Sequence, residues 1–271
     1  MNGLGSFAYT LAGGCFTAAL LMSLREIAGR QIYYYWISLM LIAGTLSITV
    51  LLAVRWIEIG QGPFLTLYEI LISSLFGLGW VLSVAYVSYP HVRVAAPIAL
   101  GVVVMLYLWA STTNQGYIPL PPTYSTPWLW VHVITGKIFL GCCLVASALA
   151  VMLMLPTRLT TAYLSARVLG RAYLIGQTWR WFAAAFLFHS AMLIAGAVWA
   201  QDAWGRYWDW DPLETWAFAT WLVMAFGLHA RTALRLDQRV GSMLIVAAFV
   251  LAFLTFFGVP FLSLSPHQGA I

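Results

Sequence analysis

Long apolar runs separated by short polar connections dominate the sequence. The runs of spanning length lie at about 6–24, 32–54, 65–88, 93–112, 127–155, 181–200, 212–230 and 240–263. A helix that crosses a bilayer needs roughly 20 mostly apolar residues, so the pattern predicts eight transmembrane helices. We therefore expect an all-α, polytopic membrane protein in which residues 1–271 form a single integral membrane domain.

Two segments need separate interpretation. The first run follows no basic region of the kind that a cleavable signal peptide has, so we expect it to be retained as the first helix. The segment between the fifth and sixth runs has arginines spread among apolar residues, which is typical of a basic helix on the membrane surface rather than a ninth span. These arginines are Arg158, Arg167, Arg171 and Arg180.

The composition excludes a water-soluble domain. Only 8% of the 271 residues are charged, with 13 Lys+Arg against 8 Asp+Glu, whereas soluble domains carry about 25% charged residues. The three cysteines lie inside apolar runs without CxxC spacing. The sequence therefore indicates neither a disulfide framework nor a thiolate metal site.

The distribution of charge predicts the orientation of the helices. The connections after the first, third, fifth and seventh runs hold ten arginines and two acids, and the opposite connections hold two arginines and six acids. By the positive-inside rule the arginine-rich set is cytoplasmic, and an even number of helices places both termini on the outer face. The net charge of +5 then reflects topology rather than nucleic-acid binding. Lys137, the only lysine, lies inside the fifth run, where this rule does not account for it.

A tryptophan-rich outer loop at about 201–214 separates the sixth and seventh runs. Asp211, Pro212 and Glu214 fit a helix start, with an N-cap, a proline at the first helical position and a capping box. That explanation leaves out the aromatic residues of the loop, which an interfacial belt and a ligand platform explain equally well. A flat aromatic ligand would suit a platform, with a carboxylate held by the loop arginine. The residues concerned are Trp204, Trp208, Trp210, Tyr207 and Arg206.

Two histidines share the expected outer face with this loop. His132 enters the fifth run from outside, and His267 follows the eighth run on the same side. Two neutral imidazoles suit the axial positions of a heme iron, and their spacing is not that of a zinc cluster. A lone histidine near a helix end is more often an ordinary interfacial residue, but the nearby tryptophan loop favours ligation.

The other histidines lie elsewhere. His91 and His229 are expected on the inner side, and His229 lies at the inner end of the helix that begins at Asp211. His189 is inside the sixth run, where an ionisable residue is costly. A functional role and a neutral histidine bonded to a neighbouring helix are equally compatible with that position.

Two motifs resemble a known family. The run Gly196-Ala197-Val198-Trp199-Ala200, followed by Trp204-Gly205-x-x-Trp208-x-Trp210-Asp211-Pro212-x-Glu214-Thr215-Trp216-Ala217 and by Leu228-His229-x-Arg231, closely resembles the WWD signature of the CcsA/ResC family. These are heme-handling proteins of System II cytochrome c biogenesis. Gly62-Pro63-x-Leu65-x-Leu67-Tyr68-Glu69 is similar to the family's outer segment ending in Leu-Tyr-Glu. The length and helix number also fit, so the resemblance covers essentially the whole chain.

The resemblance implies a set of heme contacts. His132 and His267 fall on the axial ligands of heme at the outer face, and His229 falls on a histidine that receives heme from the cytoplasmic side. The tail around His267 departs from the Gly-Leu-His-Ser-Tyr-Gly-like end that is common in the family. A propionate role for Arg206 is our own inference from the residues. The expected set that binds non-covalent heme b in transit is His132, His267, His229, Trp204, Trp208, Trp210, Arg206 and Asp211.

The resemblance also implies partners and a location. We expect a ResB/Ccs1-type membrane subunit, apocytochrome c with its CxxCH segment, and a thioredoxin-like thiol reductant. The protein would be a component of a cytochrome c synthase (heme lyase) complex in a bacterial plasma membrane or a thylakoid membrane. The sequence has no Ser-His-Asp or Cys-His arrangement that offers a protein nucleophile.

Other functions make different predictions. A CcmC-like protein that loads heme onto a chaperone typically has six helices, so a count of eight favours the CcsA-like interpretation, and CcmF-like proteins are much longer. A membrane subunit that holds heme b for electron transfer would have ligands near the bilayer middle, which favours His189 over the tryptophan loop. A transporter with a tryptophan belt would bind no heme.

Overall fold

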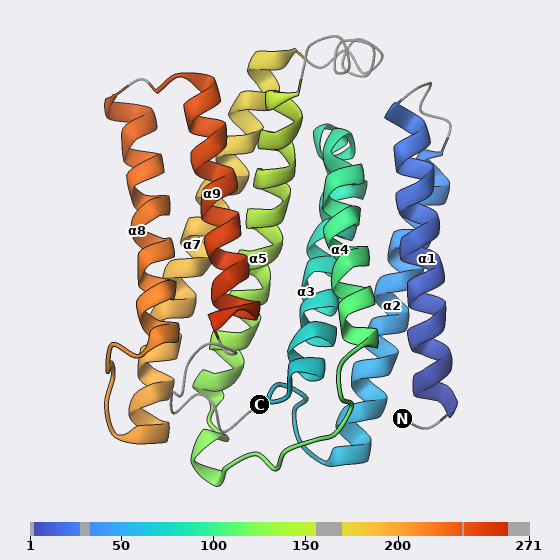
Figure 1. Cartoon of the computed structure of the whole chain (residues 1–271), viewed down its shortest axis with the longest axis vertical. Coiled ribbons are helices and arrows are strands. Elements are labelled where there is room, and N and C mark those ends of the chain that lie inside the picture. Colours follow the sequence, from blue (N-terminus) through green and yellow to red (C-terminus); the bar gives the residue numbers. More distant parts are fainter. Residues whose placement is uncertain (1–2, 28–32, 156–169, 235, 260–271) are drawn as a thin grey trace. The chain divides into compact units, whose positions relative to one another are not determined.

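The computed structural model describes residues 3–27, 33–155, 170–234 and 236–259, and these ranges are helical with no β-strand (Figure 1). The chain divides into two compact units, residues 1–118 with 155–174 and residues 119–154 with 175–271. The helices are α1 (Gly3–Ile27), α2 (Tyr34–Ile59), α3 (Leu67–Ser88), α4 (Ala96–Ser111), α5 (Pro127–Met154), α7 (Arg171–Trp204), α8 (Pro212–Ala233) and α9 (Gln238–Phe257). Two 3₁₀ helices, η1 (Pro90–Ala95) and η2 (Pro122–Tyr124), complete the described elements.

Unit 1 is an antiparallel four-helix arrangement in which α1 packs on α2 and α4, and α3 packs on the same two helices. Small residues let the helices approach closely, as is usual in membranes. A Cβ at Gly44 would lie 2.8 Å from the Phe16 ring, and one at Gly79 would lie 2.7 Å from the Thr45 hydroxyl. The helices of unit 1 therefore pack through specific close contacts and not only through unspecific apolar surface.

Unit 2 contains α5, α8, α9 and most of α7, with α9 packed on both α5 and α8. Glycines again mark close contacts, since a Cβ at Gly136 would lie 3.0 Å from the Met192 sulfur and 3.4 Å from Phe256. The loop between α7 and α8 lies at the same end of unit 2 as the start of α5 (Figure 1). This end carries most of the residues of interest.

Within the described ranges the predicted runs correspond to helices, and seven helical segments there are long and apolar enough to cross a membrane. The eighth, α8, begins at Pro212 as expected but carries Glu214 in its first turn and Arg231 in its last. The prediction of a surface helix was partly wrong, because Arg171 and Arg180 belong to the 34-residue helix α7, which begins ten residues before the expected run. Arg158 and Arg167 lie outside the described residues. Eight spans, outer termini and a single membrane domain stay predictions.

Candidate functional site

The loop between α7 and α8 contains two residues with a left-handed backbone conformation. Helix α7 ends at Trp204, and Gly205 takes a left-handed conformation with φ 76° that few other residues adopt easily. Trp210 is also left-handed, with φ 59°. A large aromatic residue in this region is unusual and indicates local strain.

The start of α8 explains how the loop ends. The Asp211 side chain accepts a 2.9 Å hydrogen bond from the Glu214 N–H, which confirms the predicted N-cap, and Pro212 occupies the first turn. The predicted capping box is wrong, because the Glu214 carboxylate accepts a 2.7 Å bond from the Asp209 N–H rather than from the N–H of the cap residue. Asp211 is buried. Its carboxylate is therefore engaged in holding the loop against the helix.

Arg206 forms an ion pair with Asp209 at 2.7 Å. Both side chains are substantially exposed, at 40% and 45%, so the pair contributes little stability. Its guanidinium can exchange that partner for another carboxylate at small cost.

The loop tryptophans divide between two clusters in unit 2. The first cluster comprises Trp199, Trp204 and Tyr124, whose rings meet edge to face with centroids 4.9–5.6 Å apart. Trp204 Nε1 donates to the Tyr124 hydroxyl at 3.2 Å, and Trp199 Nε1 donates to the Tyr124 carbonyl at 3.3 Å. Tyr124 therefore connects the entrance of α5 to the end of α7. Nothing in the composition of the sequence pointed to this residue.

The second cluster comprises Trp208, Trp210 and Phe218, with centroids 5.7–6.2 Å apart. Trp210 is 65% exposed, a large apolar surface for a single side chain. The indole Nε1 of Trp208 is buried and has no hydrogen-bond partner among the described residues. Buried donors are nearly always paired in proteins, so this N–H is suited to an additional acceptor.

His132 lies in the second turn of α5 and is held by α7. Its Nδ1 lies 2.9 Å from the Met192 carbonyl oxygen. Because a carbonyl can only accept, Nδ1 carries a proton, so in the neutral ring the lone pair is on Nε2, which is the arrangement of a metal-ligating histidine. The ring stacks on Trp199 with centroids 6.2 Å apart and planes at 19°.

Gly196 makes room for this imidazole. A Cβ at residue 196 would lie 2.6 Å from His132 Nδ1. The glycine at the start of the first motif is thus explained by a contact 64 positions away in the chain, which local sequence patterns cannot indicate.

Each of the other described histidines has its own surroundings. His267 lies outside the described residues, and His229 is exposed in the last turns of α8. His189 is 1% exposed and stacks on Phe139 with centroids 4.1 Å apart and planes at 7°. Its Nδ1 has no hydrogen-bond partner within the described part of the chain. His91 is buried in η1 of unit 1 and contacts Tyr89 and Tyr173.

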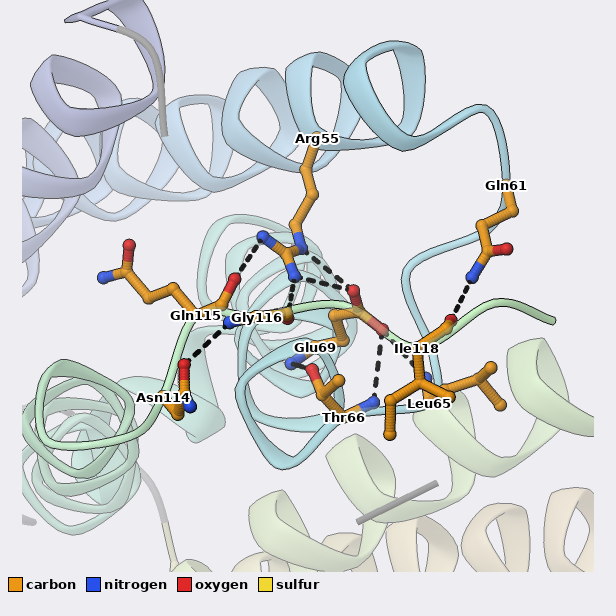
Figure 2. Close-up of polar contacts among 9 residues, drawn as sticks. All are labelled: Arg55, Gln61, Leu65, Thr66, Glu69, Asn114, Gln115, Gly116 and Ile118. Atoms are coloured by element: carbon orange, nitrogen blue, oxygen red, sulfur yellow. Dashed lines mark hydrogen bonds and ion pairs between the residues drawn. The ribbon is translucent and has the colours of Figure 1, made fainter. Parts of the chain in front are cut away.

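The second motif forms a buried ionic network in unit 1, shown in Figure 2. One Glu69 oxygen accepts from Arg55 Nε at 3.0 Å and Nη2 at 2.8 Å, and the other accepts from the Leu65 and Thr66 N–H groups. Arg55 also donates to the carbonyls of Gln115 and Gly116 at 3.1 and 2.6 Å. This network joins α2, the cap of α3 and the loop after α4. The Thr66-x-x-Glu69 spacing is a capping-box pattern that could have indicated the cap of α3, whereas no local pattern indicates Arg55 as the partner of Glu69.

Comparison with known proteins identifies the family to which this chain belongs. A model of the family described as cytochrome C assembly protein matches residues 15–267, a range that contains His132, His267 and the whole tryptophan loop. The chain belongs to the cytochrome c assembly protein family. It is an integral membrane protein, with seven helices able to span a bilayer among the described residues.

Curated relatives of this assembly protein carry the name cytochrome c biogenesis protein CcsA. The protein of Synechococcus sp. (strain JA-3-3Ab) is 28% identical, over 98% of this chain and 91% of its own. That of Guillardia theta is 30% identical over 84% and 83% of the two chains, and that of Carica papaya is 30% identical over 82% of each. The predicted resemblance to the CcsA/ResC family is confirmed.

The fold is also similar to a solved structure, cytochrome c heme lyase CcmF. The TM-score is 0.73 at 18% identity, covering 94% of this chain and 46% of that one. The assembly protein therefore spans about half the length of that structure, and the likeness concerns the fold alone.

Proposed function

We propose that this assembly protein handles heme for cytochrome c maturation and holds it at the outer face of the membrane for attachment to apocytochrome c. The observation that carries the proposal is the Nδ1–H bond of His132 to the Met192 carbonyl. It fixes the tautomer that presents Nε2 to an iron. His267 would supply the second axial ligand.

The loop would cover the bound macrocycle. Trp210 offers an exposed indole face, and Trp208 an indole N–H suited to an acceptor. Trp204 is tied to Tyr124 and would shape the site from the side of His132. Arg206, whose exposed partner Asp209 is easily exchanged, would bind a propionate. Asp211 would contribute by fixing the loop at the start of α8.

The topology predicted from the charge distribution is consistent with this assignment. With eight spans and outer termini, the tryptophan loop and the start of α5 face outward, and His229 lies at the other end of α8. His229 would receive heme b from the cytoplasmic side. The host would be a bacterial plasma membrane or a thylakoid membrane.

The chemistry of attachment belongs largely to heme and its acceptor. Each cysteine S–H of a CxxCH segment adds across a vinyl C=C, so that a C–S bond forms and the hydrogen goes to the other vinyl carbon. A thioredoxin-like reductant would keep those cysteines reduced, and a ResB/Ccs1-type subunit would complete the heme lyase complex. The protein's part is to orient heme and leave its vinyl groups accessible.

Absorption spectra of the detergent-purified protein would test this proposal, with a pyridine assay for non-covalent heme b. Wild type should show a low-spin bis-histidine spectrum in the oxidised and reduced states. His132→Gly and His267→Gly should each lose or weaken it and stop cytochrome c maturation, with partial rescue by added imidazole. Full maturation in His132→Gly without imidazole would exclude the assignment.

One observation supports a competing function, a subunit that holds heme b for electron transfer. His189 is buried in α7 with an Nδ1 that has no partner among the described residues, as a ligand within the span would require. In that case His189→Phe would lose the heme spectrum and His132→Gly would keep it. The assembly function predicts the reverse.

A further inference from the structure

Lys137 is the only lysine of the chain and lies within α5, one of the helices able to span the membrane. A cation in such a segment is costly, and its presence there usually has a functional reason. The positive-inside rule does not provide one, because Lys137 is ten residues inside the helix rather than in a connecting loop.

The surroundings of Lys137 place it at a junction of helices in unit 2. Its Nζ lies 5.8 Å from the centroid of Phe256, in the last turn of α9. The preceding residue, Gly136, lets α5 approach Met192 of α7 and Phe256 of α9 closely. The side chain is half-buried. Its charge thus lies on the α9 side of α5, near the last turn of α9.

Lys137 and His132 share one rigid element. They are five positions apart, which in an α-helix is an axial rise of about 7.5 Å and a rotation of about 140°. The His132 ring is held on the α7 side, by Met192 and Gly196. A ligand bound to His132 and extending along α5 toward α9 would therefore bring its deeper edge near Lys137.

The chemistry of heme b provides the anion. Its two carboxylates lie on the edge of the ring opposite the vinyl groups. Because the vinyl edge must be reached from the aqueous side for thioether formation, the carboxylate edge turns toward the protein. A carboxylate entering an apolar segment needs a cation or it remains an uncompensated charge.

We propose that the Lys137 ammonium binds a propionate carboxylate of the heme held by His132. This deepens the proposed function and rests on it. Arg206 lies on the exposed loop and can neutralise a carboxylate only at the rim of the site. Lys137 would thereby select for a porphyrin whose carboxylates are not esterified, and it would fix which edge of the ring faces outward.

Binding of heme and of heme dimethyl ester, in which both carboxylates are masked, tests this directly. Each would be titrated into purified protein and followed by its absorption spectrum. Wild type should bind heme about tenfold more tightly than the ester, as expected for a charge-assisted bond. Lys137→Met should remove most of that preference, the remainder being due to Arg206, while leaving affinity for the ester unchanged, and Lys137→Arg should retain more of it.

The controls separate the possible causes. Arg239→Met removes an exposed cation at the start of α9 and should behave like wild type. A Lys137→Met protein that still prefers heme tenfold would overturn the proposal, and so would equal weakening of heme and ester, which would indicate a structural role. Loss of preference in Arg206→Met but not in Lys137→Met would assign the carboxylate to the loop instead. Failure of the proposed function itself would give a different result, because His132→Gly would then bind heme and the ester as tightly as wild type does.

Discussion

At the scale of single residues, the environment of His132 determines what it can do. The Met192 carbonyl fixes its tautomer, Trp199 stacks on its ring, and Gly196 leaves the space that the ring occupies. None of these partners is a ligand itself. Partners of this kind commonly change metal affinity by 10- to 100-fold when altered.

Gly196→Ala should displace the imidazole, because the new Cβ would lie 2.6 Å from Nδ1. We expect heme affinity to fall by about 10- to 100-fold, measured by spectral titration. Gly176→Ala on the same helix meets nothing within 4 Å and should bind heme like wild type. Unchanged affinity in Gly196→Ala would show that the position of His132 is not critical.

At the scale of elements, helix ends are joined to loops by a few specific bonds. Tyr124 joins the segment before α5 to the end of α7 through two indole N–H groups. In unit 1 the Arg55–Glu69 pair joins α2 to α3 and to the loop after α4 (Figure 2). The first connection uses neutral groups and the second uses buried charges, so they should respond differently to substitution.

Tyr124→Phe should weaken the first connection, because Trp204 Nε1 loses the hydroxyl that accepts its bond. The expected loss is about 1 kcal/mol of unfolding free energy, with a lower melting temperature in detergent. Tyr117→Phe, at a 59% exposed tyrosine, is the matched control and should melt like wild type. An unchanged melting temperature in Tyr124→Phe would show that this bond contributes nothing.

Glu69→Gln should be more damaging, because it leaves the Arg55 charge buried without its counter-ion. Breaking a buried pair in this way costs about 3–5 kcal/mol. The double variant Arg55→Met/Glu69→Met removes both charges and should recover much of the stability. Wild type, Glu69→Gln and the double variant would be compared by heating each protein and measuring the folded fraction that remains by size-exclusion chromatography. A double variant no more stable than Glu69→Gln would indicate that the carbonyl contacts of Arg55 dominate.

At the scale of the whole molecule, the apolar runs were enough to predict the helices of the described ranges. Local rules also predicted the Asp211 cap, because its donor lies three residues away. Sequence reasoning did not find Tyr124 or the roles of Gly196 and Arg55, since their partners are brought close only by helix packing. The extension of α7 back to Arg171 was missed because arginines in its first turns resemble a surface segment.

The predicted orientation can be tested by cysteine labelling, because native Cys15, Cys142 and Cys143 are buried. Tyr207→Cys, in the tryptophan loop, should react with a membrane-impermeant maleimide in intact cells. Leu234→Cys, after α8, should react only when the membrane is opened. Both native positions are exposed at about 60%, so access depends on the side of the membrane. The opposite pattern would invert the topology and place His132 at the inner face.

The left-handed backbone of Trp210 has a consequence for how the sequence can change over time. This conformation costs an L-residue with a large side chain about 1 kcal/mol that glycine would not incur. Genetic drift constrained by folding alone would therefore replace this tryptophan readily, since its ring is mostly exposed and contributes little to the core. Its retention in a gene copy would record continuing demand on the loop, and its replacement by glycine would be an early sign that the copy is no longer used.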